Sequence, residues 1–237
     1  MNNVLISSYN NSDAMGKAIV ILLFFLSIYA WAIIAFKIRI VKDITVKKAA
    51  LFKMLNRTQG DILSAYQRGN TMPNAPFQNL YNAICEELSV MLDANARGGK
   101  PRKLSSVQLD NLFELADCTI SNQVLALEKY LVVLATTVSI SPLLGLLGTV
   151  WGILIAFVGM GNVGSASLTI MGSGIAEALV TTVAGLLVAI PALIGYNWIT
   201  NKVQILTREM ENFSTRILSY IQAVYCSSSA STFAGVE

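Results

Sequence analysis

Three long apolar segments dominate the pattern of hydrophobic and polar positions. Residues 18–36 contain no charged side chain, a run of about 19 that approaches the roughly 20 residues a helix needs to cross a bilayer core. Residues 130–176 form a second uncharged run that is too long for one crossing, and its middle, 159–173, is rich in Gly, Ser, Asn and Thr, as loops are. A third segment, 174–199, contains one charged residue, Glu177. The pattern predicts three membrane-spanning helices. The alternative is that these are buried helices of a large soluble core.

Composition favours the membrane interpretation. Hydrophobic residues make up 54% of the chain and charged residues 13%, about half the charge content of an average soluble domain. There is no histidine, and Cys85, Cys118 and Cys226 form no CxxC pair, so neither a zinc site nor a disulfide framework is indicated. A net charge of +3 does not point to nucleic acid. We expect no metal and no cofactor.

The basic residues predict the orientation. Six Lys and Arg residues follow the first span between positions 37 and 53, three more follow the third span, and the loop between spans two and three is uncharged. Basic residues stay on the cytoplasmic side, so the N-terminus and this loop are expected outside, and all three cysteines are cytoplasmic free thiols. The positive charges follow the first apolar run, which argues against a cleaved signal peptide. The predicted all-α organisation is an external N-terminus (1–16), a first span (17–37), a cytoplasmic helical region (38–129), a second span (130–158), a short external loop (159–173), a third span (174–200), and a cytoplasmic C-terminal helix and tail (201–237).

Helical extensions are expected below the membrane. Residues 77–96 have helical character, and Ser105-x-x-Gln108 resembles a capping box that starts the next helix. No helix breaker precedes Tyr130, so this helix is expected to run straight into the second span. Two apolar stripes at helical spacing are expected to pack on each other, the alternative being a groove for a partner. They consist of Leu109, Leu112, Ala116, Ile120, Val124 and Leu127, and of Leu206, Met210, Phe213, Ile217, Ile221 and Val224.

No combination of residues predicts catalysis. Adjacent Glu86 and Glu87 point to different sides of a helix and are interpreted as solvated surface. Gly159-x-Gly161-x-x-Gly164 matches a dinucleotide-binding pattern, but a membrane span precedes it where a strand is required, so a flexible external loop is favoured. The basic group at 100–103 is expected to be a solvated turn, with contact to anionic lipid as the alternative. The sequence therefore predicts a protein that is not an enzyme.

Small residues line one face of the second span and one of the third. Such faces let helix backbones approach closely in lipid, and two of them in a three-span chain favour an oligomer. The residues are Ser141, Gly145, Gly148, Gly152, Ala156 and Gly159 in the second span, and Ala178, Thr182, Gly185 and Ala189 in the third.

Polar side chains occur in the same two spans. Hydroxyls in a membrane helix commonly donate to the carbonyl one turn earlier, which is the ordinary explanation for an isolated Thr. Glu177 is different, because a carboxylate among apolar residues costs roughly 2.5 kcal/mol or more at the centre of a bilayer and normally faces a bundle interior or water. A single structural hydrogen bond is the alternative for Glu177. The other polar residues are Thr136, Thr137, Ser139, Thr149, Thr181 and Thr182.

Two segments carry a family resemblance. Residues 140–152 (ISPLLGLLGTVWG) and 174–192 (GIAEALVTTVAGLLVAIPA) resemble the signature segments of the MotA/TolQ/ExbB proton channel family, in its TolQ/ExbB branch, and WAII at 31–34 resembles the end of its first span. The resemblance covers nearly the whole chain. It implies a ring of identical subunits, typically a pentamer, in the bacterial inner membrane. The ring would enclose a TolR- or ExbD-like partner with a membrane aspartate, and proton flow would drive work on a TolA- or TonB-like protein across the periplasm.

The resemblance also implies roles for individual residues. Thr149 and Thr182 match pore-lining threonines, Glu177 matches the third-span glutamate, and Pro142, Pro191 and Asn197 match motif positions. Gly172-Ser173 replaces the usual Ala-Pro, and Thr181 stands where alanine is usual. Thr181 and Thr182 lie about 100° apart on a helix, so only one should face the pore, and we choose Thr182.

Three functions remain open at this point. A Tol-type role in envelope integrity and division is favoured modestly by the sequence around the first span. An ExbB-type role in TonB-dependent import is the second, and a non-conducting structural scaffold is the third.

Overall fold

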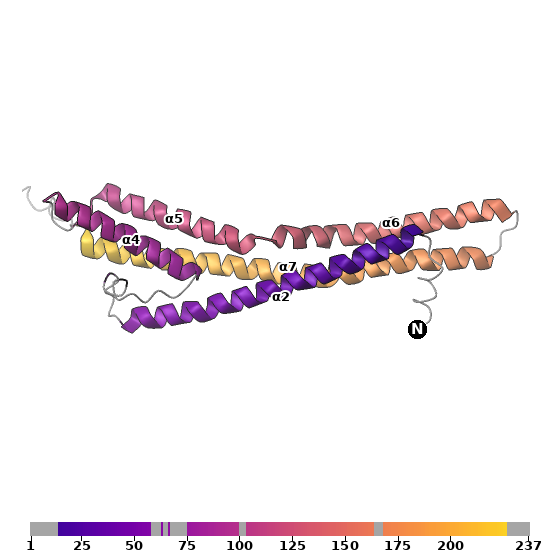
Figure 1. Cartoon of the computed structure of the whole chain (residues 1–237), viewed down its shortest axis with the longest axis horizontal. Coiled ribbons are helices and arrows are strands. Elements are labelled where there is room, and N and C mark those ends of the chain that lie inside the picture. The colour runs from indigo at the N-terminus through magenta and orange to yellow at the C-terminus, as the bar shows by residue number, and fades with distance from the viewer. Residues whose placement is uncertain are drawn as a thin grey trace, which may run out of the picture. The chain divides into compact units, whose positions relative to one another are not determined.

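The computed structural model describes residues 14–57, 63, 66, 75–99, 103–163 and 168–226, and Figure 1 shows their helices. The helices are α2 (Ala14–Arg57), α4 (Pro76–Arg97), α5 (Ser106–Glu128), α6 (Leu131–Val163) and α7 (Leu168–Tyr225). Over the described ranges, extended pairing is limited to an isolated bridge between Leu104 and Cys226. The predicted all-α fold class is confirmed.

Three helices are long and apolar enough to cross a membrane. The candidate spans lie in Ala14–Leu55 of α2, Leu131–Gly159 of α6, and Gly174–Tyr225 of α7. The number predicted from the uncharged segments is therefore confirmed by helix length and composition. Helices α2 and α7 contain 44 and 58 residues, more than one crossing requires.

The chain divides into two compact units. The first comprises Met1–Ile38 and Lys129–Thr200, and the second comprises Arg39–Glu128 and Asn201–Glu237. These limits fall within one residue of the membrane limits expected at 37/38, 129/130 and 200/201. The side of the membrane on which each segment lies stays a prediction.

The first unit has large apolar side chains on its outside and small residues inside. Phe24 and Phe25 are each 63% exposed and Leu187 is 68% exposed, whereas Ala178 is 1% exposed and Ser141 is fully buried. This distribution is the reverse of a water-soluble core. It is typical of helices that meet lipid on one side and pack through small residues on the other.

The second unit has an ordinary apolar core. Phe52 of α2, Phe77 of α4 and Phe213 of α7 form a triangle of rings with centroids 5.3 to 6.3 Å apart. Helix α4 contributes further buried side chains, including Tyr81 and Ile84, and packs against α5. The second unit therefore has the apolar interior that is typical of a water-soluble domain.

The expected capping box starts α5. The Gln108 backbone N–H donates to the Ser105 Oγ at 3.2 Å, and the Ser105 N–H donates to the Gln108 Oε1 at 3.0 Å. Two of the donors that the start of a helix leaves without partners are thereby satisfied, as in the S/T-x-x-E/Q pattern. Asn95 of α4 bonds the same Gln108 side chain, which ties the cap to the neighbouring helix.

The residues of the two apolar stripes are mostly buried, and packing of the stripes on each other stays a prediction. Val124 is half-buried and Val224 is 51% exposed, while the other stripe residues are buried. Phe213 of the second stripe contacts the rings of Phe52 on α2 and Phe77 on α4. Glu86 is exposed and Glu87 is half-exposed. Lys103 is exposed, while Lys100 and Arg102 lie outside the described residues.

The expectation of an unbroken helix into the second span is wrong. α5 ends at Glu128, and Tyr130 has φ 72°, in the left-handed region, before α6 begins at Leu131. A non-glycine residue in this region costs roughly 1–3 kcal/mol, so tertiary packing has to maintain it. Leu127 before the break and Leu131 after it are both buried, which anchors each helix separately.

The loop expected over 159–173 is mostly helical. α6 continues to Val163 and α7 begins at Leu168, so Gly159 and Gly161 belong to a helix. Gly164 of the same glycine pattern lies outside the described residues. Gly, Ser and Asn weaken a helix without excluding it, so a composition rich in these residues does not by itself predict a loop.

Candidate functional site

Helices α6 and α7 meet along faces made of small residues. A Cβ added to Gly145 would lie 2.9 Å from the Thr182 Cα, and one added to Gly185 would lie 2.5 Å from the Ser141 carbonyl oxygen. Both neighbours are backbone atoms, which cannot yield locally, so this approach requires glycine. Of the residues predicted for helix packing, seven are buried and Gly152 is half-exposed: Ser141, Gly145, Gly148, Gly152, Ala156, Ala178, Gly185 and Ala189.

This packing occurs within one chain. A Cβ on Gly152 would lie 2.8 Å from the Ala178 Cβ, and one on Gly174 would lie 2.9 Å from the Ala156 Cβ. The small faces are therefore occupied by each other and do not by themselves call for a second copy. The expected homo-oligomer must rest on other surfaces and on the family resemblance.

Three threonines form a polar cluster at this contact. The Thr182 hydroxyl donates to the Gly145 carbonyl oxygen at 3.0 Å and lies 3.4 Å from the Thr149 Oγ1. The Thr181 hydroxyl lies 3.2 Å from the same carbonyl oxygen. The structure thus brings together three of the four residues predicted for the proton pathway: Thr181 and Thr182 lie at the Gly145 carbonyl oxygen, and Thr149 lies beside the Thr182 hydroxyl.

The bonds of Thr149 and Thr181 inside their own helices set the direction of their protons. The Thr149 hydroxyl donates to the Leu146 carbonyl oxygen at 2.7 Å, and the Thr181 hydroxyl donates to the Ala178 carbonyl oxygen at 2.7 Å. When the Thr149 hydroxyl donates to Leu146, its lone pairs remain available to accept a hydrogen bond. The cluster contains hydroxyls that both donate and accept without a fixed charge.

The remaining hydroxyls of α6 have the ordinary role expected for membrane helices. Thr136, Thr137 and Ser139 each donate to the carbonyl four residues earlier, at 2.8, 3.0 and 3.2 Å. None of these three bonds crosses to another helix. The cross-helix bonds therefore separate the cluster from the rest of the polar residues in the span.

The adjacent threonines of α7 differ in exposure. Thr181 is 3% exposed and packs against Gly148, where an added Cβ would clash with its side chain, whereas Thr182 is half-buried. Thr182 is thus the more accessible of the two hydroxyls. Its selection as the residue that faces a pore stays a prediction.

Glu177 is half-buried near the start of α7. Within the described part of the chain, no hydrogen bond or ion pair joins its carboxylate to another residue. Among the described residues, Glu177 therefore forms no hydrogen bond with the threonine cluster. It lies one turn before Thr181 on the same helix face.

The motif prolines lie inside helices that continue through them. Pro142 occurs within α6 and Pro191 within α7, and both are half-buried. Each proline lacks the N–H that would bond the carbonyl four residues earlier, which weakens the helix locally. Asn197 is exposed.

Sequence reasoning missed two features of this unit. Lys37 is expected to flank the first span as a charged residue, but it is only 3% exposed. The sequence pattern around Lys37 does not predict this burial. The Gly145 carbonyl was not considered as an acceptor, although its place in a small-residue face predicts close contact. Among the described residues, no three Cys, Asp or Glu side chains gather to hold a metal ion.

Comparisons with known proteins identify a family and several relatives of this chain. The model of a family described as "MotA/TolQ/ExbB proton channel family" matches residues 82–212. A "Tol-Pal system protein TolQ" of Haemophilus influenzae is 29% identical over 201 residues, 83% of this chain and 84% of the relative. A "Biopolymer transport protein ExbB" of Salmonella typhimurium is 31% identical over 193 residues, 80% of this chain and 74% of the relative. A second TolQ, of Pseudomonas aeruginosa, is 44% identical over 95 residues, 40% of this chain and 41% of the relative.

Proposed function

The chain belongs to the MotA/TolQ/ExbB proton channel family, and we propose from this membership that it is an inner-membrane subunit of a proton-driven motor. With a TolR- or ExbD-like single-span partner, a ring of copies converts the proton motive force into mechanical work on a TolA- or TonB-like protein. The role is not enzymatic and uses no cofactor. The process that we favour is the maintenance of envelope integrity and cell division through a Tol-Pal system.

The threonine cluster is the observation that supports this proposal most strongly. The Oγ1 atoms of Thr149 and Thr182 lie 3.4 Å apart, on the two spans whose sequences carry the family segments. Hydroxyls can accept a proton on one lone pair and donate their own, so they solvate a moving proton without a permanent charge. A membrane potential contributes about 2.3 kcal/mol per charge per 100 mV, which is the driving force for such a path.

Removing each hydroxyl tests the proposal. Thr149→Val and Thr182→Val keep the side-chain shape and remove the polar group, while Thr149→Ser and Thr182→Ser restore the hydroxyl. In bacteria that lack their own TolQ, we expect the Val variants to leak periplasmic proteins and the Ser variants to retain much of the rescue. Thr137→Val is the matched control, because Thr137 is also buried in α6 but bonds only within its helix.

The scaffold hypothesis gives the opposite result. A structure that only assembles a partner does not need a hydroxyl at either position, provided that the variant accumulates normally. Full rescue by both Val variants at wild-type protein level would therefore contradict proton conduction and support the scaffold.

The ExbB-type role is the second candidate, supported by the 31% identity to the Salmonella ExbB over most of both chains. The TolQ of Haemophilus covers a somewhat larger share of each chain, which supports the Tol assignment modestly. Expression in strains lacking either TolQ or ExbB separates them. Repair of envelope leakage supports the first role, and repair of TonB-dependent uptake of iron complexes supports the second.

A further inference from the structure

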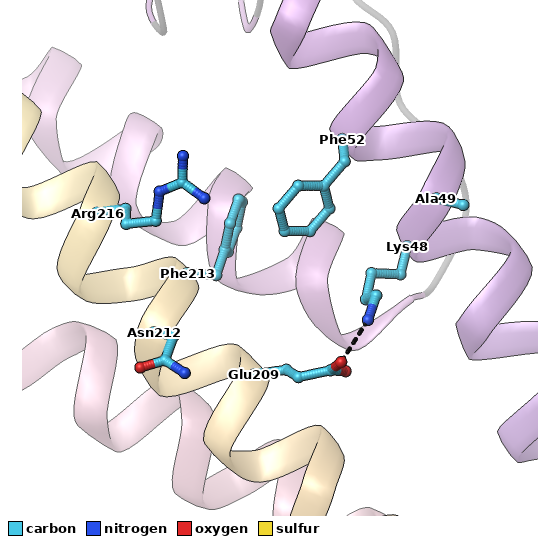
Figure 2. Close-up of a pocket in the computed structure, with 7 residues that line it drawn as sticks. All are labelled: Lys48, Ala49, Phe52, Glu209, Asn212, Phe213 and Arg216. Carbon is cyan, nitrogen blue, oxygen red and sulfur yellow. Dashed lines mark ion pairs between the residues drawn. The ribbon is translucent and has the colours of Figure 1, made fainter.

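The second unit contains a cleft of about 340 Å³ between α2 and α7 (Figure 2). The Phe52 and Phe213 rings form its apolar part, with centroids 5.3 Å apart. On one side, the Lys48 Nζ lies 2.7 Å from a Glu209 carboxylate oxygen, so that ion pair is already closed. The full lining is Lys48, Ala49, Phe52, Glu209, Asn212, Phe213 and Arg216.

Arg216 supplies a cation at this cleft. Its side chain is exposed, and no ion pair joins it to another residue in the described ranges. Its helices add to the charge: residues 39–57 contain six basic residues and one acidic, and residues 201–225 contain three basic and two acidic, a formal total of +6. The cleft is therefore suited to an acidic partner surface.

Helix α5 presents such a surface. Asp110, Glu114 and Asp117 follow at intervals of four and three residues, which places them on one helix face, and all three are exposed. The structure gives none of them an ion pair with another described residue. Together, α4 and α5 contain seven acidic residues and one basic, a formal total of −6. The formal charge of α4 and α5 is therefore opposite in sign and equal in magnitude to that of residues 39–57 and 201–225.

The acidic face and the cleft also match in position along their helices. Lys48 lies about 15 Å beyond Ile38, where the first unit ends on α2, at 1.5 Å per residue. Asp117 lies about 16 Å and Glu114 about 21 Å before Glu128, where the second unit ends on α5. The residues of the two surfaces thus lie at similar distances along their helices from the ends of the second unit.

We propose that neighbouring copies of this chain assemble by docking the acidic face of α5 (Asp110, Glu114 and Asp117) of one copy into the α2/α7 cleft of the next. The inference rests on the proposed function in that it takes the protein to be a homo-oligomer. The small faces of α6 and α7 are occupied within the chain, so assembly needs another surface. Two different surfaces meet at this contact, and such a heterologous contact closes into a ring when its rotation allows.

Cross-linking in native membranes tests the contact with a cysteine that the chain already has. Cys118 is exposed and lies one turn after Glu114, while Asn212 lines the cleft and is exposed. We expect full-length Asn212→Cys in a Cys226→Ser background to form, with a short bis-maleimide, a ladder that extends beyond the dimer. The matched control adds Cys118→Ser and should give no cross-linked product. This readout requires no proton coupling, so its failure is distinct from failure of the proposed function.

Each other outcome overturns the proposal. Absence of cross-links would mean that something else occupies the cleft, and a product that stops at the dimer would mean a symmetric contact. A cross-linked dimer in the Cys118→Ser control would place position 212 next to its own equivalent.

A charge exchange gives a second test. Arg216→Glu should reduce the ladder about tenfold, as expected for loss of an interfacial charge pair. Combining it with Glu114→Arg or Asp117→Arg should restore the ladder. Arg208→Glu, an exposed change on α7 outside the cleft lining, is the control and should have little effect. An undiminished ladder in Arg216→Glu would contradict the proposed contact. Failure of both double variants to restore the ladder would contradict it as well.

Discussion

The hydroxyl of Thr182 and the carbonyl oxygen of Gly145 are joined by a hydrogen bond of 3.0 Å across α6 and α7. The bond exists because position 145 has no side chain, so that the α7 backbone comes within van der Waals distance. The same small-residue contact therefore packs the two helices and gathers the hydroxyls. A larger residue at position 145 would therefore disturb both the packing and the hydrogen bond, so the hydroxyls are tested with variants that keep the side-chain shape.

Gly185→Ala should destabilise the membrane unit. The new Cβ would lie 2.5 Å from the Ser141 carbonyl oxygen and 3.2 Å from the Gly145 Cα, and both are backbone atoms. Overpacking of this kind costs about 1–3 kcal/mol, so we expect a lower apparent Tm in detergent and less protein in membranes. Gly159→Ala is the control in α6, because nothing lies within 4 Å of its Cβ position. Equal stability of the two variants would contradict the close packing.

Much of this fold is predictable because its signals are local. The uncharged segments predict the three span-length helices, and Ser105 with Gln108 predicts the start of α5, since each pattern depends on neighbours in sequence. The break at Tyr130 is not predictable in this way. Its left-handed backbone is maintained by packing on either side, and tyrosine is not a residue that sequence patterns associate with that conformation.

The candidate site is predictable only in part for a related reason. Periodicity places Thr182 and Gly185 on one face of α7, but it does not specify which carbonyl of α6 lies opposite. The acceptor role of the Gly145 carbonyl and the burial of Lys37 depend on the rotation of one helix against another. The sequence therefore identifies the participating residues but not their partners.

Ser105→Ala should destabilise the second unit by about 1 kcal/mol, the usual cost of losing an N-cap side chain. The variant removes the acceptor for the Gln108 N–H and leaves the reciprocal bond from the Ser105 N–H. Gln108→Ala should cost more, because it also removes the bonds to Asn95. Thermal unfolding followed by circular dichroism measures both. Ser106→Ala at the exposed next position is the control, and a larger loss there would contradict the capping role.

Cys85 should resist alkylation in the folded protein. Burial raises the pKa of its thiol to about 12 from 9.0, although a hydrogen bond with Tyr81 acts in the opposite direction. Only the thiolate reacts, so at pH 8 the reactive fraction is about a thousandfold lower than for an ordinary thiol. The Cys118→Ser/Cys226→Ser variant isolates Cys85. Maleimide should label it in denaturant and leave it unlabelled without denaturant, with little gain up to pH 9. Rapid labelling of the folded protein would contradict this burial.

Glu177→Gln and Glu177→Ala should abolish energised function without preventing accumulation of the protein. Within the described residues, the carboxylate has no bonded partner, so its removal breaks no such contact and should shift the apparent Tm little. A half-buried carboxylate in a predicted span is retained at an energetic cost, which favours a role in handling protons or in contacting the partner's acid. Rescue of envelope integrity in bacteria lacking TolQ measures the loss. Glu211→Gln, an exposed carboxylate on the same helix, should rescue fully. A Glu177→Gln variant as active as this control would show that the proton pathway does not need the carboxylate, whereas equal loss in both would indicate a general effect of charge on α7.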